Sequence, residues 1–267
     1  MTMNPIYLST GTFTGRINGR NFRLLAEHWQ KFHCDGFELM VFSELYPLIS
    51  QLPQIYRGIP IPMLHADKRI GDLLSDEYGF DAARDMYLQN AELALSLGAK
   101  RMVVHGWGIP DSDNNAPRSY ERILSLHRMG QNMGVETLFE NCCCVTEDPL
   151  LHMTRLAAMD ASIRFIVDTR PAQFHNQLAD TLHSPVFCRH TAHMHINDYA
   201  GGYKDWKSLY PIPQPGSGNI CWSDVFSALQ ETGYSGSITL EAPSMLAEGV
   251  DDATLNQGLS FIRAYLA

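Results

Sequence analysis

The sequence predicts an α/β protein folded as a single (β/α)8 barrel. Short apolar runs rich in Val, Ile and Leu alternate with longer segments of helical periodicity, which is the pattern of repeated βα units around a parallel sheet. Eight such runs can be counted, and the 267 residues suit one barrel, for which about 250 residues are typical. No Pro/Ser-rich linker, low-complexity tract or charge run marks a boundary, so we expect residues 1–267 to form one domain.

The predicted strands are runs of four to six residues in which apolar side chains dominate. Each run is separated from the next by a segment long enough for a crossover, as parallel strands require. The eight predicted strands are Ile6–Ser9, Gly36–Val41, Ile61–His65, Met102–His105, Thr137–Asn141, Ile163–Asp168, Ala192–Asn197 and Ser237–Glu241.

The predicted helices lie between these strands and carry recognisable end signals. Gly98, Gly134 and Gly233 each follow a periodic segment as C-terminal stop signals, and Ser223 is the expected N-cap after the turn PGSGN. The predicted helices are Phe22–Phe32, Phe80–Leu97, Tyr120–Met133, Pro149–Met159, Ser223–Thr232 and Thr254–Leu266.

The segment Tyr199–Asn219 is long and rich in Gly and Pro, which predicts a lid or binding loop after the seventh strand. A doubly wound open sheet is the alternative fold. Its dinucleotide site would need a complete glycine motif after the first strand, and the turn STGTFTG is only loosely glycine-rich. The barrel is therefore favoured.

Charge and composition exclude several classes of function. There are 20 Lys and Arg against 29 Asp and Glu, a net charge of −9, so non-specific nucleic-acid binding is disfavoured. No run approaches the ~18 apolar residues of a membrane span, and the N-terminus lacks a basic segment followed by an apolar one. We expect a cytoplasmic protein, without a membrane partner, whose six cysteines are reduced thiols.

The most informative feature is the residue that closes each strand, because active sites of βα barrels form at the carboxyl ends of the strands. The third to eighth strands all end in a side chain able to bind a metal or move a proton. These six residues are His65, His105, Glu140, Asp168, His195 and Glu241. One such residue is most often a cap or a solvated group, whereas six on one rim indicate a site.

Four of these ends offer a metal-binding set. Glu140, Asp168 and His195 are spaced by 28 and 27 residues, which is about one βα unit each, and Glu241 follows after one unit and the long loop. Three carboxylates and one imidazole are mostly hard oxygen donors, which suit Mn, Mg or Co, and zinc is also compatible. A cation would also explain how three carboxylates can share one site.

The strand ends and their flanking motifs resemble those of the xylose-isomerase-like barrels, the superfamily of sugar isomerases and epimerases that includes endonuclease IV, inosose dehydratase and hydroxypyruvate isomerase. The resemblance runs along nearly the whole chain and is specific to the superfamily through the order of its motifs. The motifs are CDGFELM, LGAKRMVVHG, LFEN, FIVDT, HMHIND and PGSGNICWSDVFSALQETGYSGSITLE.

The resemblance implies that Glu140, Asp168, His195 and Glu241 hold one divalent metal ion, and that Glu140 and Glu241 also form a proton-transfer pair. It implies a metal-dependent isomerase or epimerase of a sugar or sugar acid, working through an enediolate. Two alternatives stay open: a dehydratase or lyase of a cyclic polyol, and a non-catalytic sugar-binding relative. The expected partner is a small carbohydrate, and the sequence is compatible with a homo-oligomer.

Two departures from the family pattern restrict the analogy. Family members often carry a DxxH motif after the sixth strand, but here Asp168 is followed by Thr, Arg and Pro171. Arg170 in that turn is expected either to meet a substrate carboxylate or phosphate or to lie at the surface. The Asp-x-His pair of endonuclease IV is replaced by Tyr210–Ile212, which argues against a trinuclear phosphodiesterase site.

Three rim residues complete the predicted substrate contacts. His65 and His105 are expected either to bind substrate hydroxyls or to be satisfied within the core, and Trp107 either to stack on a sugar or to plug the barrel mouth.

The sequence also suggests roles for other polar residues near the rim. Glu38 and His193 are expected to be structural, with Glu38 a partner of a histidine. Lys68, Arg69 and Lys204 are loop cations that could meet an anion or be solvated, and the cysteines after Asn141 are given no catalytic role.

Overall fold

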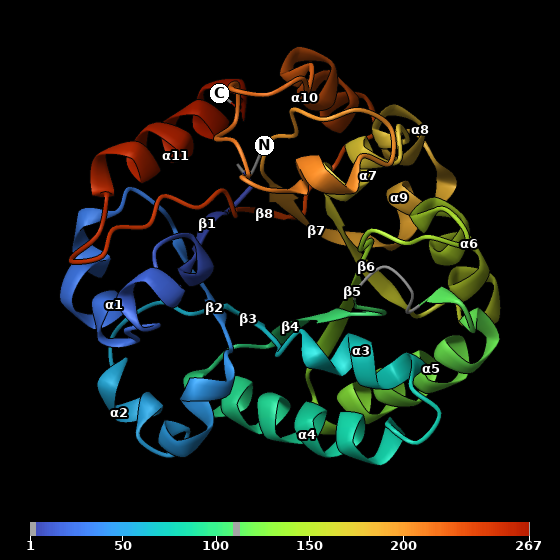
Figure 1. Ribbon diagram of the computed structural model, residues 1–267, viewed down its shortest axis with the longest axis horizontal. Helices are drawn as coiled ribbons and strands as arrows, with labels where there is room; N and C mark the ends of the chain where they lie inside the picture. Colours follow the sequence, from blue (N-terminus) through green and yellow to red (C-terminus); the bar gives the residue numbers. More distant parts are fainter. Residues whose placement is uncertain (1–3, 109–112, 267) are drawn as a thin grey trace.

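The eight predicted strands close into a parallel barrel surrounded by helices (Figure 1). The structure is a computed structural model that describes residues 4–108 and 113–266. Each strand pairs with its neighbours in chain order, and β1 pairs with β8. The predicted (β/α)8 fold is therefore confirmed. The strands are β1 (Ile6–Ser9), β2 (Gly36–Met40), β3 (Met63–His65), β4 (Arg101–His105), β5 (Glu136–Glu140), β6 (Arg164–Asp168), β7 (Thr191–Ile196) and β8 (Ser237–Leu240).

All six predicted helices are present, together with shorter ones that the sequence did not indicate. The α-helices are α1 (Arg23–His28), α2 (Leu52–Ile55), α3 (Arg69–Ser75), α4 (Phe80–Leu97), α5 (Ala116–Met133), α6 (Pro149–Met159), α7 (Thr169–Phe174), α8 (Leu178–Leu182), α9 (Pro185–His190), α10 (Trp222–Glu231) and α11 (Asp252–Leu266). Short 3-10 helices occupy Thr10–Thr12, Arg16–Asn18, Trp29–Lys31, Ser43–Leu48 and Trp206–Leu209.

Helix ends differ from expectation at two places. The predicted helix Phe22–Phe32 is divided into α1 and a 3-10 turn. The prediction that Ser223 caps α10 was wrong, because α10 begins one residue earlier, at Trp222, and Cys221 occupies the N-cap position. Gly98 and Gly134 end their helices in the left-handed conformation, with φ of 81° and 79°, as their stop signals predict.

Successive side chains of each strand point alternately out towards the helices and into the barrel, so the interior contains two separately packed regions. Side chains that point outward from the sheet pack against the helices in the main apolar core. Inside the barrel, the middle of β3 to β6 is filled by a separate group of four fully buried apolar residues: Met63, Val103, Leu138 and Ile166. On the β2, β7 and β8 side the same level is polar, with Glu38, His193 and Ser237 buried.

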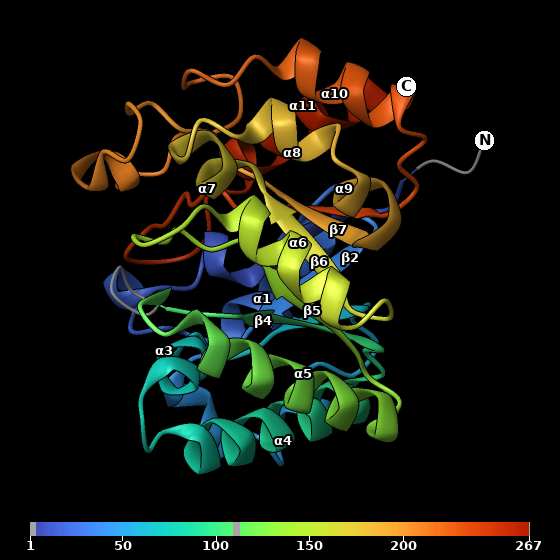
Figure 2. The same ribbon diagram turned by 90° about the vertical axis from the view of Figure 1, so that its right-hand side faces the viewer.

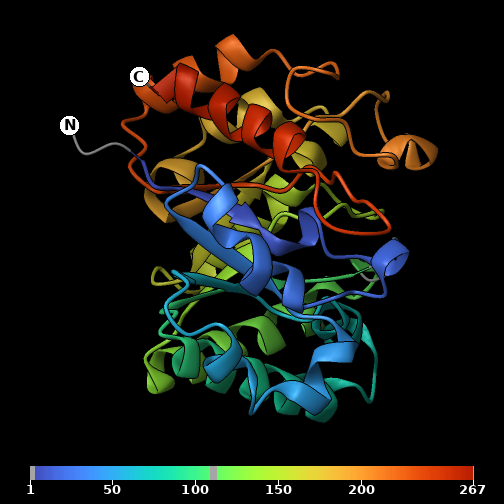
Figure 3. The same ribbon diagram turned by 90° about the vertical axis from the view of Figure 1, so that its left-hand side faces the viewer.

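The segment after β7 reaches beyond the barrel at the end opposite the N-terminus, as Figures 2 and 3 show from two sides. Asp198 anchors this segment at both ends. Its carboxylate accepts hydrogen bonds from the backbone N–H of Gly216 and Ile220 and from the indole N–H of Trp222. The loop therefore has a fixed base and carries the 3-10 helix Trp206–Leu209 over the barrel mouth. No helix in the described ranges has the length and apolar character that a membrane crossing requires.

Candidate metal centre

The four predicted ligands come together at the carboxyl end of the barrel. Glu140 and Asp168 are the last residues of β5 and β6, His195 is next to last in β7, and Glu241 directly follows β8. One ligand atom from each lies within 4.8 Å of those of the other three, and all four side chains are buried. The pairing of Asp168 with His195 in the sheet sets these two at the same level.

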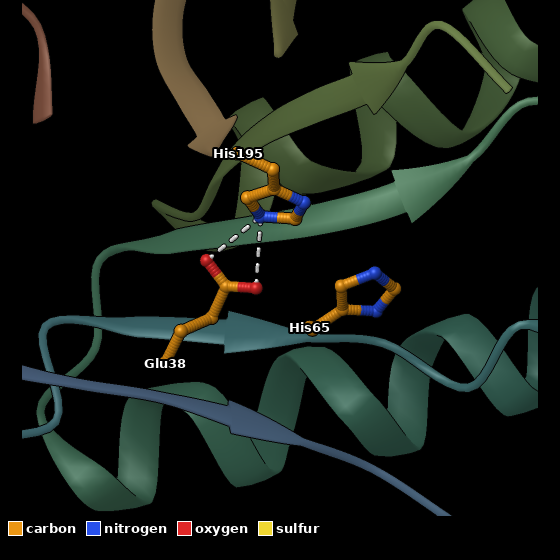
Figure 4. Close-up of side chains that lie close together, drawn as sticks. All are labelled: Glu38, His65 and His195. Carbon is orange, nitrogen blue, oxygen red and sulfur yellow. Dashed lines mark hydrogen bonds and ion pairs between the residues drawn. The ribbon is translucent and has the colours of Figure 1, made fainter. Parts of the chain in front are cut away.

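His195 is held between two carboxylates. Its Nε2 lies 3.0 Å from Glu38 Oε1, and its Nδ1 lies 3.1 Å from Glu241 Oε2 (Figure 4 shows the Glu38 contact). A neutral imidazole carries one proton and can donate to only one of them. Burial opposes a second proton, but the charges of Glu38 and Glu241 raise the pKa of His195 well above its ordinary value.

A divalent ion fits this arrangement. A cation would displace the Nδ1 proton of His195, leaving the Nε2 proton donated to Glu38 and a lone pair on Nδ1 that faces Glu241. A metal ion accepts such lone pairs, and a carboxylate on the far nitrogen of a ligating histidine is a common second-layer contact. The residues present therefore fit a cation held by Glu140, Asp168, His195 and Glu241.

The three carboxylates of this set differ in the direction in which their pKa values are shifted. Against the effect of burial, His105 lowers the pKa of Glu140 well below its ordinary value, and His195 lowers that of Glu241 to about 2. The pKa of Asp168 is raised to about 7, because burial and the charges of Glu140 and Glu241 outweigh the nearby Arg170. Without a cation, Asp168 is therefore the most readily protonated of the three carboxylates.

His65 and His105 both point at Glu140. Their Nε2 atoms lie 3.4 Å and 2.9 Å from Glu140 Oε2. Because His65 Nδ1 donates to the carbonyl of Ala66, its Nε2 has no proton when the ring is neutral. His65, His105 and Glu140 also have ligand atoms close enough together for a cation, and this set shares Glu140 with the four-residue centre. The substrate role of the two histidines stays a prediction.

Glu38 is the hub of a buried polar network beneath the centre. Its Oε2 accepts from Thr239 Oγ1 at 3.0 Å and lies 3.1 Å from Nε2 of His193, whose Nδ1 is bonded to Ser237. Glu38 and His193 thus have the structural surroundings that the sequence predicts, His193 at the expected level and Glu38 one layer below the rim position expected for it. Thr239 and Ser237 were missed, although their two-residue spacing before Glu241 puts all three on one face of β8.

Two asparagines that follow the ligand strands were also missed. Asn141 accepts from the backbone N–H of Asp168 at 2.6 Å and donates to its carbonyl at 3.1 Å, so it fixes the end of β6. Asn197 donates to Asp168 Oδ2 at 3.4 Å, and Thr169 donates to the Asn197 carbonyl. The letters LFEN and HIND carry the signal, because a polar residue beside a ligand is placed to orient its neighbour.

A cavity of about 450 Å³ opens above the centre and reaches its residue Glu140, beside His105. Its rim is formed by the loops after β3, β4, β5, β6 and β7. The other lining residues are Lys68, Asp72, Gly108, Cys142, Cys143, Arg170, Pro171, Trp206, Leu209 and Tyr210. Arg170, a predicted substrate contact, therefore lines a cavity. Cys143 lines it too, and burial raises the pKa of its thiol to about 12, so the side chain is a neutral thiol near pH 7.

Trp107 is placed differently from a stacking residue. Its side chain is only 3 % exposed, its indole N–H donates to the carbonyl of Cys142, and its ring packs on His152 at 4.5 Å between centroids. It fills space beneath the rim, which is the plug that the sequence left as an alternative. His175, the first histidine after β6, has structural partners of its own: its Nδ1 lies 3.1 Å from Asp148, and its Nε2 accepts from the backbone N–H of Cys144.

Comparison with known proteins places this architecture in a known group. A family model described as a xylose isomerase-like TIM barrel matches residues 43–265. No curated protein matches the sequence.

Solved structures match along nearly the whole chain, at identities that show the fold alone. D-psicose 3-epimerase with D-tagatose from Clostridium cellulolyticum H10 has a TM-score of 0.73 at 14% identity, covering 98% of this chain and 99% of the other. 3-Keto-D-glucoside 4-epimerase from E. coli has a TM-score of 0.71 at 19% identity, with the same coverage. The IOLI protein with a binding zinc atom has a TM-score of 0.67 at 14% identity, covering 98% and 96%.

Proposed function

This chain belongs to the xylose isomerase-like TIM barrel family, and from that premise we propose that it is a divalent-metal-dependent isomerase or epimerase of a sugar or sugar acid. One observation carries the proposal: Glu140, Asp168, His195 and Glu241 converge beneath a cavity large enough for a monosaccharide. The sugar epimerases among the similar folds give it additional support.

The proposed ion is Mn, Mg or Co, with zinc compatible, held by the four converging side chains. When bound, it polarises a substrate carbonyl and a neighbouring hydroxyl, which acidifies the C–H between them and stabilises the charge of the enediolate. The zinc atom in the IOLI protein is a precedent for a metal in this fold.

The chain's own residues supply the proton transfers. Glu140 at the end of β5 and Glu241 after β8 come from well-separated strands, so they reach the substrate from two sides. Their low pKa values in the free protein keep both in the ionised form near neutrality, which is the form that a general base requires. One removes the proton from the carbon next to the carbonyl and the other returns it, which inverts that carbon; return to the neighbouring carbon exchanges aldose and ketose.

Other side chains orient these groups and keep water out. Glu38 fixes the ring of His195, and Asn141 fixes the end of β6 that carries Asp168. Trp206 and Leu209, from the loop after β7, cover the cavity with apolar surface. Such cover lowers the local dielectric and strengthens the charge interactions on which enolisation depends.

Solvent exchange tests the two-carboxylate mechanism before the substrate is known. The metal-supplemented protein is incubated in D2O with a panel of ketoses, sugar acids and inososes, and deuterium at the carbon next to the carbonyl is measured by mass spectrometry. Glu140→Gln and Glu241→Gln should each reduce this exchange at least ~100-fold, the usual size of a general-base contribution. Glu136→Gln is the matched control, since Glu136 lies at the opposite end of β5 and pairs with Arg101.

The same panel separates the alternatives. Undiminished exchange in both variants would exclude the proposed mechanism. A product lighter by one water would reassign the protein to the dehydratases, and ligand-induced stabilisation without exchange in any member of the panel would favour a non-catalytic sugar-binding relative.

A further inference from the structure

Two cationic side chains face the cavity above the metal centre, from different sides of the barrel. Lys68 lies in the loop after β3, immediately before α3, and Arg170 lies in the first turn of α7, after β6. Both line the cavity whose floor is Glu140.

These two cations lack the partners that their neighbours have. Arg69 pairs with Asp67 at 2.6 Å, and Lys204 pairs with Asp148 at 3.3 Å. Within the described part of the chain, no carboxylate lies within 4.0 Å of the Lys68 ammonium or the Arg170 guanidinium. Lys68 is exposed and Arg170 is half-buried, and a cation at the rim of a cavity can pair with an anionic group of a ligand that enters it.

Arg170 is held in place with donors to spare. One terminal nitrogen donates to the carbonyl of Leu209 at 3.1 Å, and the guanidinium lies 5.6 Å from the centre of the Tyr210 ring. Its Nε is buried and has no hydrogen-bond partner. A fixed planar guanidinium with unused N–H groups suits a carboxylate or phosphate, whose oxygens match its spacing.

The acids of the cavity do not account for both cations. Among the described lining residues the acids are Glu140 and Asp72. Glu140 is engaged by His105 and His65, and the carboxylate of Asp72 packs against the backbone of Gly108, where a Cβ would overlap it. Asp168 accepts from the backbone N–H of Arg170 at 2.8 Å, and although its charge acts on the guanidinium it makes no ion pair with it within 4.0 Å.

We propose that the substrate of this site is an anion: a hydroxy-ketone with a carboxylate or a phosphate, bound by Lys68 and Arg170 while its other end reaches Glu140 and Glu241. The assignment rests on the proposed function for the reactive end of the substrate. The assignment of the anionic end depends only on Lys68 and Arg170, and the rings of Tyr210 and Trp206 offer a surface for the carbon chain.

Three sugars that differ at one carbon test the proposal. D-Fructose, D-fructuronate and D-fructose 6-phosphate share the hydroxy-ketone end and carry, at the sixth carbon, a hydroxyl, a carboxylate and a phosphate. Their affinities for the Mg-loaded, full-length protein are measured by titration calorimetry. One of the two anions should bind about tenfold to hundredfold more tightly than D-fructose, as expected for charge-assisted hydrogen bonds. The stronger anion identifies the carboxylate or the phosphate as the group recognised.

The variants assign the effect to the two residues. Arg170→Gln and Lys68→Gln should each remove most of the preference for the anion over D-fructose, and Arg170→Lys should restore part of it. Lys207→Gln is the matched control: it changes the net charge equally, and Lys207 is an exposed neighbour of lining residues without lining the cavity. That variant should keep the full preference.

The outcomes separate this inference from the proposed function. Equal affinity for the three sugars, or a preference that survives both glutamine variants, overturns the anionic substrate even if solvent exchange is observed. A preference for one anion that the variants abolish, without exchange in D2O, supports the anion site and counts against the isomerase mechanism.

Discussion

Two separate buried clusters of potential metal ligands lie in the loops and strand ends at the carboxyl side of the barrel, and they differ in how far their hydrogen bonds are satisfied. The first is the centre formed by Glu140, Asp168, His195 and Glu241. The second consists of Asp113, Cys144 and His152, whose ligand atoms also lie within 4.8 Å of one another. Residue types alone would assign a metal to both.

The second cluster is complete without a metal. The carboxylate of Asp113 accepts from the backbone N–H groups of Val145, Thr146 and Glu147 at 2.9 to 3.1 Å. His152 Nε2 lies 3.3 Å from Asp113, and the Tyr120 hydroxyl donates to its Nδ1 at 2.6 Å. Every acceptor faces a donor, so this cluster ties the loop that contains Asp113 to the loop after β5.

In the first cluster carboxylates outnumber the available donors. Glu140, Asp168 and Glu241 crowd one imidazole, and the contacts of Glu140 with His105 and of Glu241 with His195 are hydrogen bonds only while those ring nitrogens carry a proton. An unpaired buried acceptor is costly unless a proton or a cation fills the gap. The balance of donors and acceptors, rather than the choice of residues, is therefore the reason why we propose the cation site at the first cluster and not at the second.

The largest expected effect is on metal content. Purified protein should contain about one divalent ion per chain, and the Asp168→Ala, His195→Ala double variant should contain almost none, because it keeps only two of four ligands. Metal analysis after gel filtration measures this directly. Full retention of metal by the double variant would contradict the assignment of the first cluster.

The second cluster should respond in stability instead. Asp113→Ala leaves three backbone N–H groups and His152 without an acceptor in a buried place, which should lower the free energy of unfolding by about 3 to 5 kcal/mol, measured by urea denaturation. Asp113→Asn should lie between the two, since its amide oxygen still accepts. Metal content should stay at the wild-type value; its loss in a folded Asp113→Ala protein would make this cluster a metal site as well.

The fold was predictable because the barrel repeats one simple pattern. Alternating apolar runs and periodic segments located all eight strands to within two residues at either end. The errors lie where side chains far apart in sequence decide a boundary. α10 begins at Trp222 instead of the expected Ser223, and the indole of Trp222 is bonded to Asp198, a contact that no local signal reveals.

The ligand set could be located from strand ends, but its supporting residues could not. Asp168 and Glu241 close their strands, so counting repeats is sufficient to find them. The role of Asn141 depends on the register of β5 against β6, and the buried place of Trp107 depends on His152 from α6. Register and cross-element packing are tertiary properties, and a single sequence does not specify them.

The smallest effect is a contrast in pH dependence between the two aspartates. The pKa of Asp168 is raised to about 7, so the folded metal-free protein keeps a proton that the unfolded chain, with a pKa of about 3.9, releases. The free energy of unfolding of the metal-free protein should therefore fall as the pH rises from about 4 to 7. The pKa of Asp113 is lowered by the bonds it accepts, despite burial, so its contribution is complete above pH ~4 and lost only in acid.

Asp168→Asn isolates the first of these slopes. In metal-free protein at pH 8 the variant should be more stable than the wild type by roughly 2 to 4 kcal/mol, because it does not pay for an ionised buried carboxylate, and at pH 4 the two should coincide. Saturating Mg should reverse the order at pH 8, since the wild type alone gains the full free energy of binding. Parallel stability curves for the two proteins, with and without metal, would show that Asp168 is as well satisfied as Asp113 and would remove the distinction between the clusters.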